Sequence, residues 1–396
     1  MEESTVLARL PLELLGKILG FYVTTHTLKA ASLVCKTWTP FAQEHLFSSV
    51  VVTHQNVHAF AQALASNPEI RHLTCSLCLD DSPGHSGTSS SLGGHVSFVR
   101  SLENSRRLRT LELRFISVMS LSAMLPDLVL SFLPITTLEC EKVQFSSFPQ
   151  LIQFICSFKS IQNLRLINID VADSIGNFLQ TTANARLSPS LRTCSAFIPN
   201  YTTPFLHWLQ NHDPAPLIGL FRIALVPPRS DPIPQETLSL WLGVRSLIVN
   251  LDILCLSLDA TQSLGEFDLA GCMNLRRLAI HSVDYLELPA RCNLSRLAEL
   301  LGTVCSDAME EVRIDLVSLR VVDFGLLDWE GIDLALSTRC FSHLKRVFIG
   351  VQAVLSLEDF RGHINTWLPI CRQRGLLHVE RIPSPLFTSY KWLTIQ

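Results

Sequence analysis

Two histidines and two cysteines are the first side chains in this chain whose types and spacing could do chemistry. His72, Cys75 and Cys78 follow the spacing His-x-x-Cys-x-x-Cys, and His85 comes shortly afterwards. A structural zinc site needs four nitrogen or sulfur ligands that converge as a tetrahedron. Cys75, however, occupies an inward position of an apolar pattern, and His85 lies in a Ser/Gly-rich stretch. We therefore interpret Cys75 as a core residue and His85 as a surface residue, and we expect no metal site.

Clustered carboxylates are the second candidate, because paired carboxylates perform general acid–base catalysis. Asp328 and Asp333 flank Trp329, and Asp323 precedes them. Acidic side chains in this arrangement are typical of a helix N-terminus, where they interact favourably with the helix dipole. We therefore interpret them as a helix cap and not as a catalytic pair.

Other catalytic motifs are absent from the sequence. It has no Gly-rich phosphate loop, no Gly-x-Ser-x-Gly turn for a nucleophilic serine, and no His-Glu-x-x-His pair for a catalytic metal. We therefore expect no catalytic residues and no cofactor, and the protein is not expected to be an enzyme.

The overall composition argues against several classes of partner. The net charge is −3, which gives no basic surface for nucleic acid or for an anionic membrane. Hydrophobic residues make up 47% of the chain and charged residues only 17%, which favours a fold with repeated apolar layers.

The cysteines and the N-terminus predict a reducing compartment. The twelve cysteines are scattered among apolar neighbours, so we expect buried thiols rather than a disulfide framework. Met1 is followed by Glu2 and Glu3 instead of a signal peptide, and no apolar run reaches the roughly 18 residues of a membrane span. We expect the protein in the cytoplasm, the nucleus or both.

The first fifty residues predict a short helical hairpin. Pro11 suits the first turn of a helix, and Leu14 and Ile18 continue an apolar stripe at helical spacing. The polar run at residues 24–27 ends this helix, and a second helix starts near Leu28. About forty residues bury too little apolar surface for independent stability. The hairpin must therefore complete its core against a partner or against the rest of the chain.

Over residues 10–47 this segment resembles the F-box of ubiquitin-ligase substrate receptors. The matching residues are Leu10-Pro11 at the start, the pairs Leu14-Leu15 and Ile18-Leu19, and Val34-Cys35-Lys36 followed by Trp38. The whole chain is similar in style to fungal F-box proteins that carry a degenerate leucine-rich-repeat domain. The resemblance implies that the F-box binds the Skp adaptor and, through it, a cullin. Carried over by position, the adaptor-binding residues would be Leu10, Pro11, Leu14, Ile18, Leu33, Val34, Cys35 and Trp38.

Past residue 68, the pattern apolar-x-x-apolar-x-apolar recurs, mostly at intervals of about 25 to 31 residues. Each match predicts a short strand whose residues alternate between inward and outward positions. No single segment buries its own apolar face, so the segments must stack, which favours a leucine-rich-repeat solenoid. The matches start at Ile70, Leu108, Ile135, Ile161, Leu191, Ile218, Val244, Leu275, Leu319 and Leu344, and a terminal cap is expected near residues 376–379.

These patterns together predict an α/β protein: a small all-α F-box followed by a solenoid in which a curved parallel sheet carries helices on its convex side. Residues 1–50 would form the F-box module, residues 51–69 a connecting helix, and residues 70–396 the degenerate repeat domain with a flexible loop at 80–95. The long gap at 275–319 would hold an insertion or an unrecognised repeat. An ordinary α/β domain with evenly spaced strands is the alternative to the solenoid.

The concave face of such a solenoid should carry the functional surface, because the residues between the buried positions project onto it. This face mixes both charges with polar and aromatic side chains, which suits a folded protein or a peptide better than a polyanion. The residues expected to bind a substrate are Glu112, Arg114, Glu139, Arg165, Phe197, Arg222, Arg277 and His281.

The sequence thus favours a substrate-recognition adaptor of an SCF-type cullin ubiquitin ligase, in which the F-box docks the Skp adaptor and the repeats bind an unknown protein substrate. Neither nucleic acid nor a membrane is expected as a partner. Two alternatives stay open: a leucine-rich-repeat scaffold without a role in a ligase, and an α/β enzyme whose catalytic groups are not recognised from the sequence.

Overall fold

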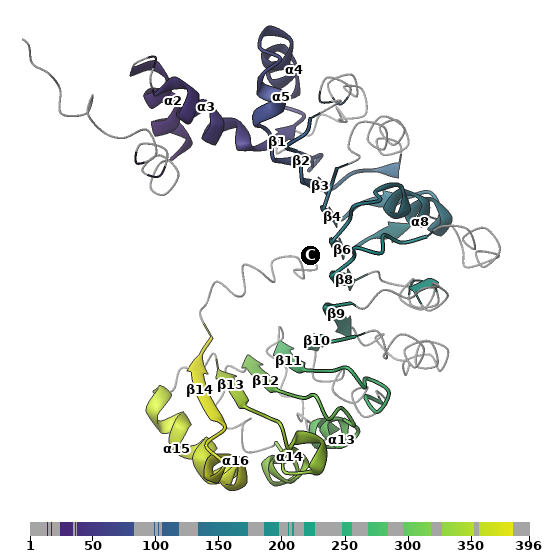
Figure 1. The fold of residues 1–396 in the computed structure, drawn as a ribbon, viewed down its shortest axis with the longest axis vertical. Helices are drawn as coiled ribbons and strands as arrows, with labels where there is room; N and C mark the ends of the chain where they lie inside the picture. Colours follow the sequence, from purple (N-terminus) through teal and green to yellow (C-terminus); the bar gives the residue numbers. More distant parts are fainter. Residues whose placement is uncertain are drawn as a thin grey trace, which may run out of the picture. The chain divides into compact units, whose positions relative to one another are not determined.

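The computed structural model describes residues 14, 17, 24–34, 36, 38–82, 99, 102, 105–118, 134–172, 186–197, 205, 208–209, 218–225, 248–255, 268–283, 296–317, 327–351 and 356–382. The chain has a mixed α/β fold built on parallel strands (Figure 1). It divides into two compact units. The first consists of Met1–Ile161 and Ile169–Phe178, and the second of Gln162–Asn168 and Leu179–Gln396. No helix in the described part of the chain is long and apolar enough to cross a membrane.

The first unit begins with helices and continues as a parallel sheet in the strand order β1-β2-β3-β4. Its helices are α2 (Thr25–Val34), α3 (Thr39–Ser48), α4 (Val57–Ser66), α5 (Ile70–Leu73) and α8 (Phe148–Ser157). Its strands are β1 (Ser49–Thr53), β2 (Ser76–Asp80), β3 (Thr110–Arg114) and β4 (Thr137–Glu141), with the short parallel pair β5 (Gln144–Phe145) and β7 (Asp170–Val171).

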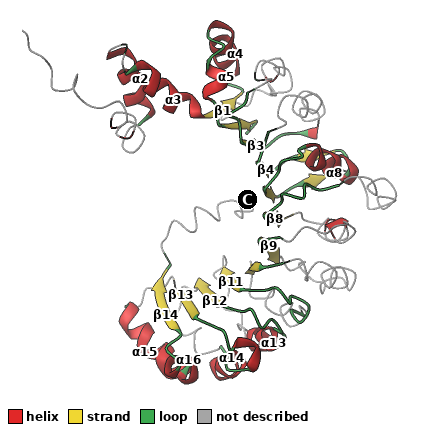
Figure 2. Cartoon of the chain, in the orientation of Figure 1, coloured by secondary structure: helices red, strands yellow, loops and turns green. Residues whose placement is uncertain are grey.

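The second unit contains further parallel strands in the order β6-β8-β9-β10-β11-β12-β13-β14. These strands are β6 (Asn163–Ile167), β8 (Thr193–Phe197), β9 (Leu220–Leu225), β10 (Asn250–Cys255), β11 (Arg277–Val283), β12 (Glu311–Val317), β13 (Arg346–Val351) and β14 (Leu377–Arg381). Its helical segments are α13 (Arg296–Gly302), α14 (Trp329–Leu336), the 3-10 turn η5 (Arg339–Phe341), α15 (Leu357–Trp367) and α16 (Pro369–Gln373). Figure 2 shows α13, α14 and α16 on one side of strands β11 to β14.

The strands form where apolar and polar residues alternate. In β3, Leu111 and Leu113 are fully buried, while Thr110, Glu112 and Arg114 on the opposite face are half-buried. This is the pattern of a sheet with one face in the core. The same backbone hydrogen-bond arrangement recurs just before several strands. One carbonyl that precedes a strand accepts from two successive N–H groups that precede or begin the neighbouring strand. The carbonyl of Cys75 does so for residues 109 and 110, at 2.8 and 3.1 Å.

Helix α8 shows how a helix follows a strand in this chain. Ser147 caps its N-terminus by accepting from the N–H of Gln150 at 3.3 Å, and Pro149 occupies the first turn. Its apolar residues, such as Leu151 and Phe154, are buried. The helix therefore begins at a local serine and proline signal and buries its apolar face against the core.

The predicted strand at Val244 was placed wrongly. It is displaced, because β10 starts at Asn250, with Ile248 buried just before the strand and Leu251 buried within it. The match at Leu319 lies outside the described residues, and β12, which starts at Glu311, is an unrecognised strand within the long gap at 275–319. A loose apolar pattern fits more than one register in an apolar chain, and only the backbone pairing with the neighbouring strand selects one of them.

The start of the sheet also differs from the prediction. Residues 70–73 form helix α5, and the strand that follows is β2. Residues 49–53 form β1, which lies in the region assigned to the F-box and the connecting helix. This strand pairs in parallel with β2. The connecting segment does contain a helix, α4, but the sheet begins some twenty residues before residue 70.

Candidate interaction surfaces

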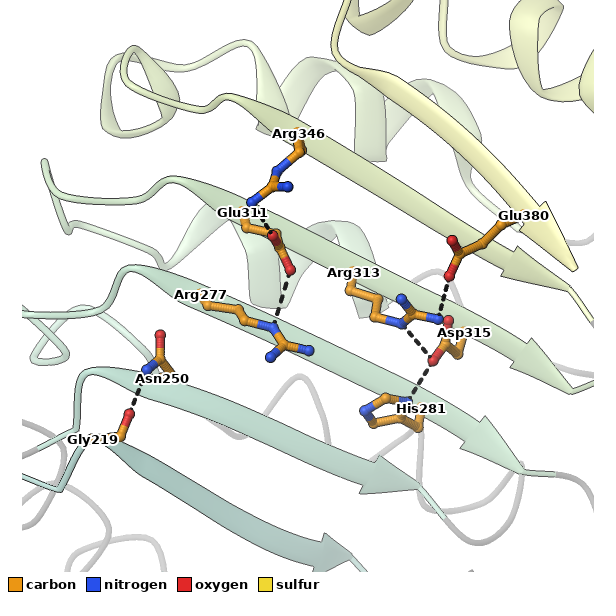
Figure 3. Close-up of polar contacts among 9 residues, drawn as sticks. All are labelled: Gly219, Asn250, Arg277, His281, Glu311, Arg313, Asp315, Arg346 and Glu380. Atoms are coloured by element: carbon orange, nitrogen blue, oxygen red, sulfur yellow. Dashed lines mark hydrogen bonds and ion pairs between the residues drawn. The ribbon is translucent and has the colours of Figure 1, made fainter. Parts of the chain in front are cut away.

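The parallel register of β11, β12 and β13 brings charged side chains into rows on one face of the second unit. Arg277 pairs in register with Glu311, and Glu311 with Arg346. Arg277 Nε lies 3.1 Å from Glu311 Oε1, without hydrogen-bond geometry, and Arg346 lies 3.0 Å from Glu311 Oε2 (Figure 3). Glu311 is therefore held between two guanidinium groups from the neighbouring strands. At the same level of β10, Asn250 donates to the carbonyl of Gly219.

The middle row is aromatic and cationic. Arg313 is in register with Phe348, and Phe348 with His378 of β14. The Phe348 and His378 rings stack with centroids 5.1 Å apart. The guanidinium carbons of Arg313 and Arg346 lie 5.8 and 5.6 Å from the Phe348 ring centroid, within the range of a cation–π contact.

The third row contains a buried ionic cluster around Asp315. One oxygen of Asp315 accepts from His281 Nδ1 and from Arg313 Nε, both at 2.8 Å. Arg313 also reaches Glu380 of β14 at 2.7 Å. The Asp315 side chain is only 4% exposed. Burial alone would raise the pKa of Asp315, but the hydrogen bonds from His281 and Arg313 outweigh it and hold the pKa below its ordinary value.

Gly350 is the residue that makes room for this cluster. A Cβ at Gly350 would come within 3.0 Å of Asp315 Cγ and 2.8 Å of Ile382 Cγ1, and still closer to Asp315 Oδ1. That second oxygen is buried and has no hydrogen-bond partner among the described residues. A glycine is required here because the carboxylate occupies the space of a side chain.

This arrangement can recognise a partner but leaves little room for chemistry. A histidine hydrogen-bonded to an aspartate is the orienting half of a hydrolytic triad. Here, however, Asp315 is shared with Arg313, and both members of the pair are buried. The residues of the network that reach solvent most are Arg346, which is exposed, and His378, which is exposed too, while Arg277, Glu311, Arg313, Phe348 and Glu380 are half-buried. They offer both charges and an aromatic surface.

The first unit carries a second group of charged side chains, on β3 and β4, that is more acidic. Glu112 is in register with Glu139, and Arg114 with Glu141. Arg114 contacts Glu112 at 2.5 Å and Glu141 at 3.9 Å. Both contacts are partly exposed, so they contribute modestly to stability.

The histidines and cysteines considered above as zinc ligands form no metal site among the described residues. Burial, followed by the nearby charge of Glu112, raises the pKa of Cys78 to about 12, which disfavours the thiolate that zinc requires. The Cys75 thiol donates to the carbonyl of Leu73 at 3.6 Å. His85 lies outside the described residues. No group of three or more His, Cys, Asp or Glu residues in the described ranges is arranged to hold a metal ion.

The carboxylates proposed from the sequence as a cluster bind the N-termini of two different helices, α14 and α16. Asp328 caps α14 by accepting from the N–H of Gly331 at 2.9 Å, which confirms the predicted cap. Asp333 is buried and accepts from the N–H groups of Ile370 and Cys371 at the start of α16, at 2.8 and 3.0 Å. Asp323 lies outside the described residues.

The N-terminal helices expose apolar side chains. Leu28, Ala31 and Ala42 are buried between α2 and α3, and Trp38, Phe41 and Leu46 pack partly buried against them. Leu33, at the end of α2, is 87% exposed, and Leu14 is 46% exposed. Among the described residues of this segment, the two leucines lie outside the core and present an apolar surface.

The predicted adaptor-binding and substrate-binding residues are only partly visible. Leu10, Pro11, Ile18 and Cys35 lie outside the described residues, and so do the side chains of Val34, Phe197 and Arg222. Arg165 lies on β6, on the row that continues through β8 and β9. His281, expected on the open face, is instead buried beside Asp315.

The sequence prediction did not include the residues of β12, which lie at the centre of the charged network. Glu311, Arg313 and Asp315 alternate strictly with the apolar residues Val312 and Ile314. That period-two alternation is a strand signal in its own right and could have revealed β12.

Comparison with known proteins gives no relative for this chain: no family model matches it, and neither does any curated protein.

Proposed function

We propose that the chain is a substrate-recognition adaptor of an SCF-type cullin ubiquitin ligase. In this proposal the N-terminal helices act as an F-box that docks the Skp adaptor, and the strand-lined remainder binds a protein substrate. The observation that carries it is the exposure of Leu14 and Leu33, two positions of the F-box resemblance, outside the described core of Leu28, Ala31 and Ala42. An adaptor of this kind works in the cytoplasm or the nucleus.

The remainder of the chain is proposed to be a leucine-rich-repeat solenoid, with helices on its convex side. Two features support this. Consecutive strands pair in parallel at offsets near 30 residues, as in Thr193 beside Asn163, and the apolar residues before each strand recur with them. Such segments bury their apolar faces only against their neighbours.

The mechanism of the proposed adaptor is proximity. Holding a substrate beside a ubiquitin-charged partner raises its effective concentration, so no catalytic group is needed on this chain. The substrate would contact the exposed sides of Arg277, Arg346, Phe348 and His378. Arginine and aromatic side chains together are typical of the energetic centre of a protein–protein interface.

Adaptor binding by the purified full-length chain tests the proposal. The double variant Leu14→Asp/Leu33→Asp places two charges in the proposed contact and should weaken binding of the Skp adaptor by at least about tenfold. The matched control is Leu334→Asp, because Leu334 is also an exposed leucine on a helix, 63% exposed on α14. It should bind as the wild type does.

Two outcomes would contradict the proposal. If the folded wild-type chain does not bind the adaptor, a repeat scaffold without a ligase role becomes the better interpretation. If the double variant and the control bind equally well, the exposed leucines are not the contact.

A further inference from the structure

The segments that lead into β12 and β13 repeat one another at a fixed offset. Glu311 is in register with Arg346, and the carbonyl of Glu310 accepts from the N–H of Lys345, which lies 35 residues later in the sequence. Helices α13 and α14, which precede these strands, are in contact, and a Cβ at Gly331 would lie 3.0 Å from the Ala298 side chain.

The turns that join α13 to β12 and α14 to β13 contain corresponding hydrogen bonds at the same offset. The Thr303 hydroxyl donates to Leu300 at 2.7 Å, and the Thr338 hydroxyl donates to Ala335 at 2.8 Å. The next turn hydrogen bonds also correspond: Met309 N–H to the carbonyl of Ser306, and Leu344 N–H to the carbonyl of Phe341. These hydrogen bonds therefore correspond at an offset of 35 residues, although residues 339–341 form a 3-10 turn and residues 304–306 do not.

Cys305 and Cys340 occupy the same position in these two turns. Neighbouring parallel strands are about 4.8 Å apart, and the Cα atoms of a disulfide are about 4.4–6.8 Å apart, so stacked cysteines meet the distance requirement. The Cys340 thiol is also one of the neighbours that raise the pKa of Cys305. Both cysteines are reduced in this structure.

Oxidants can reach this pair but not most of the other described thiols. Cys305 is exposed and Cys340 is half-buried. Of the remaining cysteines whose side chains the structure describes, only Cys75 is half-buried, and the others are buried: Cys78, Cys140, Cys156, Cys194, Cys272 and Cys371.

We propose that Cys305 and Cys340 form a reversible oxidation site, closing a disulfide that links the turn before β12 to the turn before β13. The co-reactant is a small-molecule disulfide of the glutathione class. The Cys305 thiolate attacks one sulfur of that disulfide and releases one glutathione thiolate, which gives a mixed disulfide. The Cys340 thiolate then attacks the Cys305 sulfur and releases the second glutathione. Two protein thiols are oxidised, one disulfide is reduced to two thiols, and the two protons pass to the leaving thiolates.

The reaction should be faster above neutral pH. Burial raises the pKa of Cys305, and the neighbouring Cys340, Asp268 and Asp307 raise it further, so thiolate formation at this position requires alkaline conditions. The site is independent of the proposed adaptor function, and each can fail without the other.

Disulfide mapping of the full-length chain tests this site. The reduced protein is equilibrated with mixtures of oxidised and reduced glutathione near pH 8, its remaining thiols are alkylated, and its peptides are analysed without reduction. The peptides that contain Cys305 and Cys340 should be recovered joined, two hydrogen atoms lighter than their sum, and dithiothreitol should separate them. The link should form at least about tenfold more in the folded chain than in denaturant, because the fold holds the thiols together.

Variants decide between this site and unspecific oxidation. In Cys305→Ser or Cys340→Ser, the remaining thiol should carry glutathione instead of a link. Cys75→Ser is the matched control, since Cys75 is also half-buried, and it should leave the link unchanged. The proposal is overturned if both thiols of the folded wild type carry separate glutathiones, pair with other cysteines, or stay free under conditions that oxidise a model dithiol peptide.

Discussion

Asp315 accepts hydrogen bonds from His281 and Arg313 through one carboxylate oxygen, and its other oxygen lies against Gly350. Each partner depends on the others. The glycine provides the space, the carboxylate holds the guanidinium, and Arg313 in turn reaches Glu380. Removing one member of a buried ionic group leaves the remaining charges without compensation, which costs more than the group contributes as a whole.

The substitution Asp315→Asn tests this cluster through its pH dependence. The folded-state pKa of Asp315 is lowered, so its stabilising contribution is present above the unfolded-state pKa and is lost as the pH falls through the folded-state pKa. At neutral pH the variant should be less stable than the wild type by about 3–5 kcal/mol. The difference should shrink as the pH is lowered below the ordinary aspartate range, as measured by urea unfolding at a series of pH values.

Glu310→Gln is the control for that series. Glu310 pairs with Lys345 at 2.9 Å on the surface, where an ion pair contributes little. Its unfolding curve should follow that of the wild type at every pH. A pH-independent difference between wild type and Asp315→Asn would contradict the ionic account and favour a loss of packing.

Among the helices and strands, the ends of the C-terminal helices depend on side chains from neighbouring elements. Asp333 of α14 caps α16, and Arg374, just after α16, donates to the carbonyls of Leu336 and Phe341 at 3.0 and 2.9 Å. Stacking of the Trp329 and Trp367 rings, at 5.4 Å, adds a contact between α14 and α15. These contacts tie short helices together that would be unstable alone.

Asp333→Ala should therefore destabilise the chain by about 1–3 kcal/mol, because it leaves two N–H groups at the start of α16 without an acceptor. Asp328→Ala removes an exposed cap with one hydrogen bond and should cost about 1 kcal/mol or less. Thermal unfolding of the two variants, with amide hydrogen exchange at residues 370 and 371, measures the difference. Equal losses in both variants would show that burial of the cap is unimportant.

At the scale of the whole molecule, each of the two units extends its sheet by pairing parallel strands edge to edge. In the second unit, β14 is the last strand, and it pairs with β13 through residues 377–381. Removal of the terminal strand exposes the unpaired backbone edge of the strand before it.

A chain that stops after Val351 loses β14, α15 and α16, and it uncovers Val347 and Ile349, which are fully buried in the intact chain. We expect a lower unfolding temperature and concentration-dependent association by light scattering. A chain that stops after Ile382 keeps these contacts and is the control. If both truncated chains stay monomeric with the same unfolding temperature, β14 does not act as a protective cap.

The sequence by itself determined the elements whose signals are local. Alternating residues located β3 and β4, the serine and proline before residue 150 began α8, and the aspartate at position 328 capped α14. The apolar residues of the N-terminal helices likewise indicated a module with a surface to cover. These features depend on neighbours within a few residues, where periodicity and capping act.

Only the tertiary structure decided which residues meet across the sheet. The apolar pattern allowed several registers for β10 and β12, and pairing with β9, β11 and β13 selected one of them. That choice placed Asp315 against His281 and Gly350, and Cys305 beside Cys340. The two residues of each pair lie more than thirty positions apart in the sequence, and a shift of β12 by one residue would turn Asp315 to the opposite face of the sheet, away from His281 and Gly350.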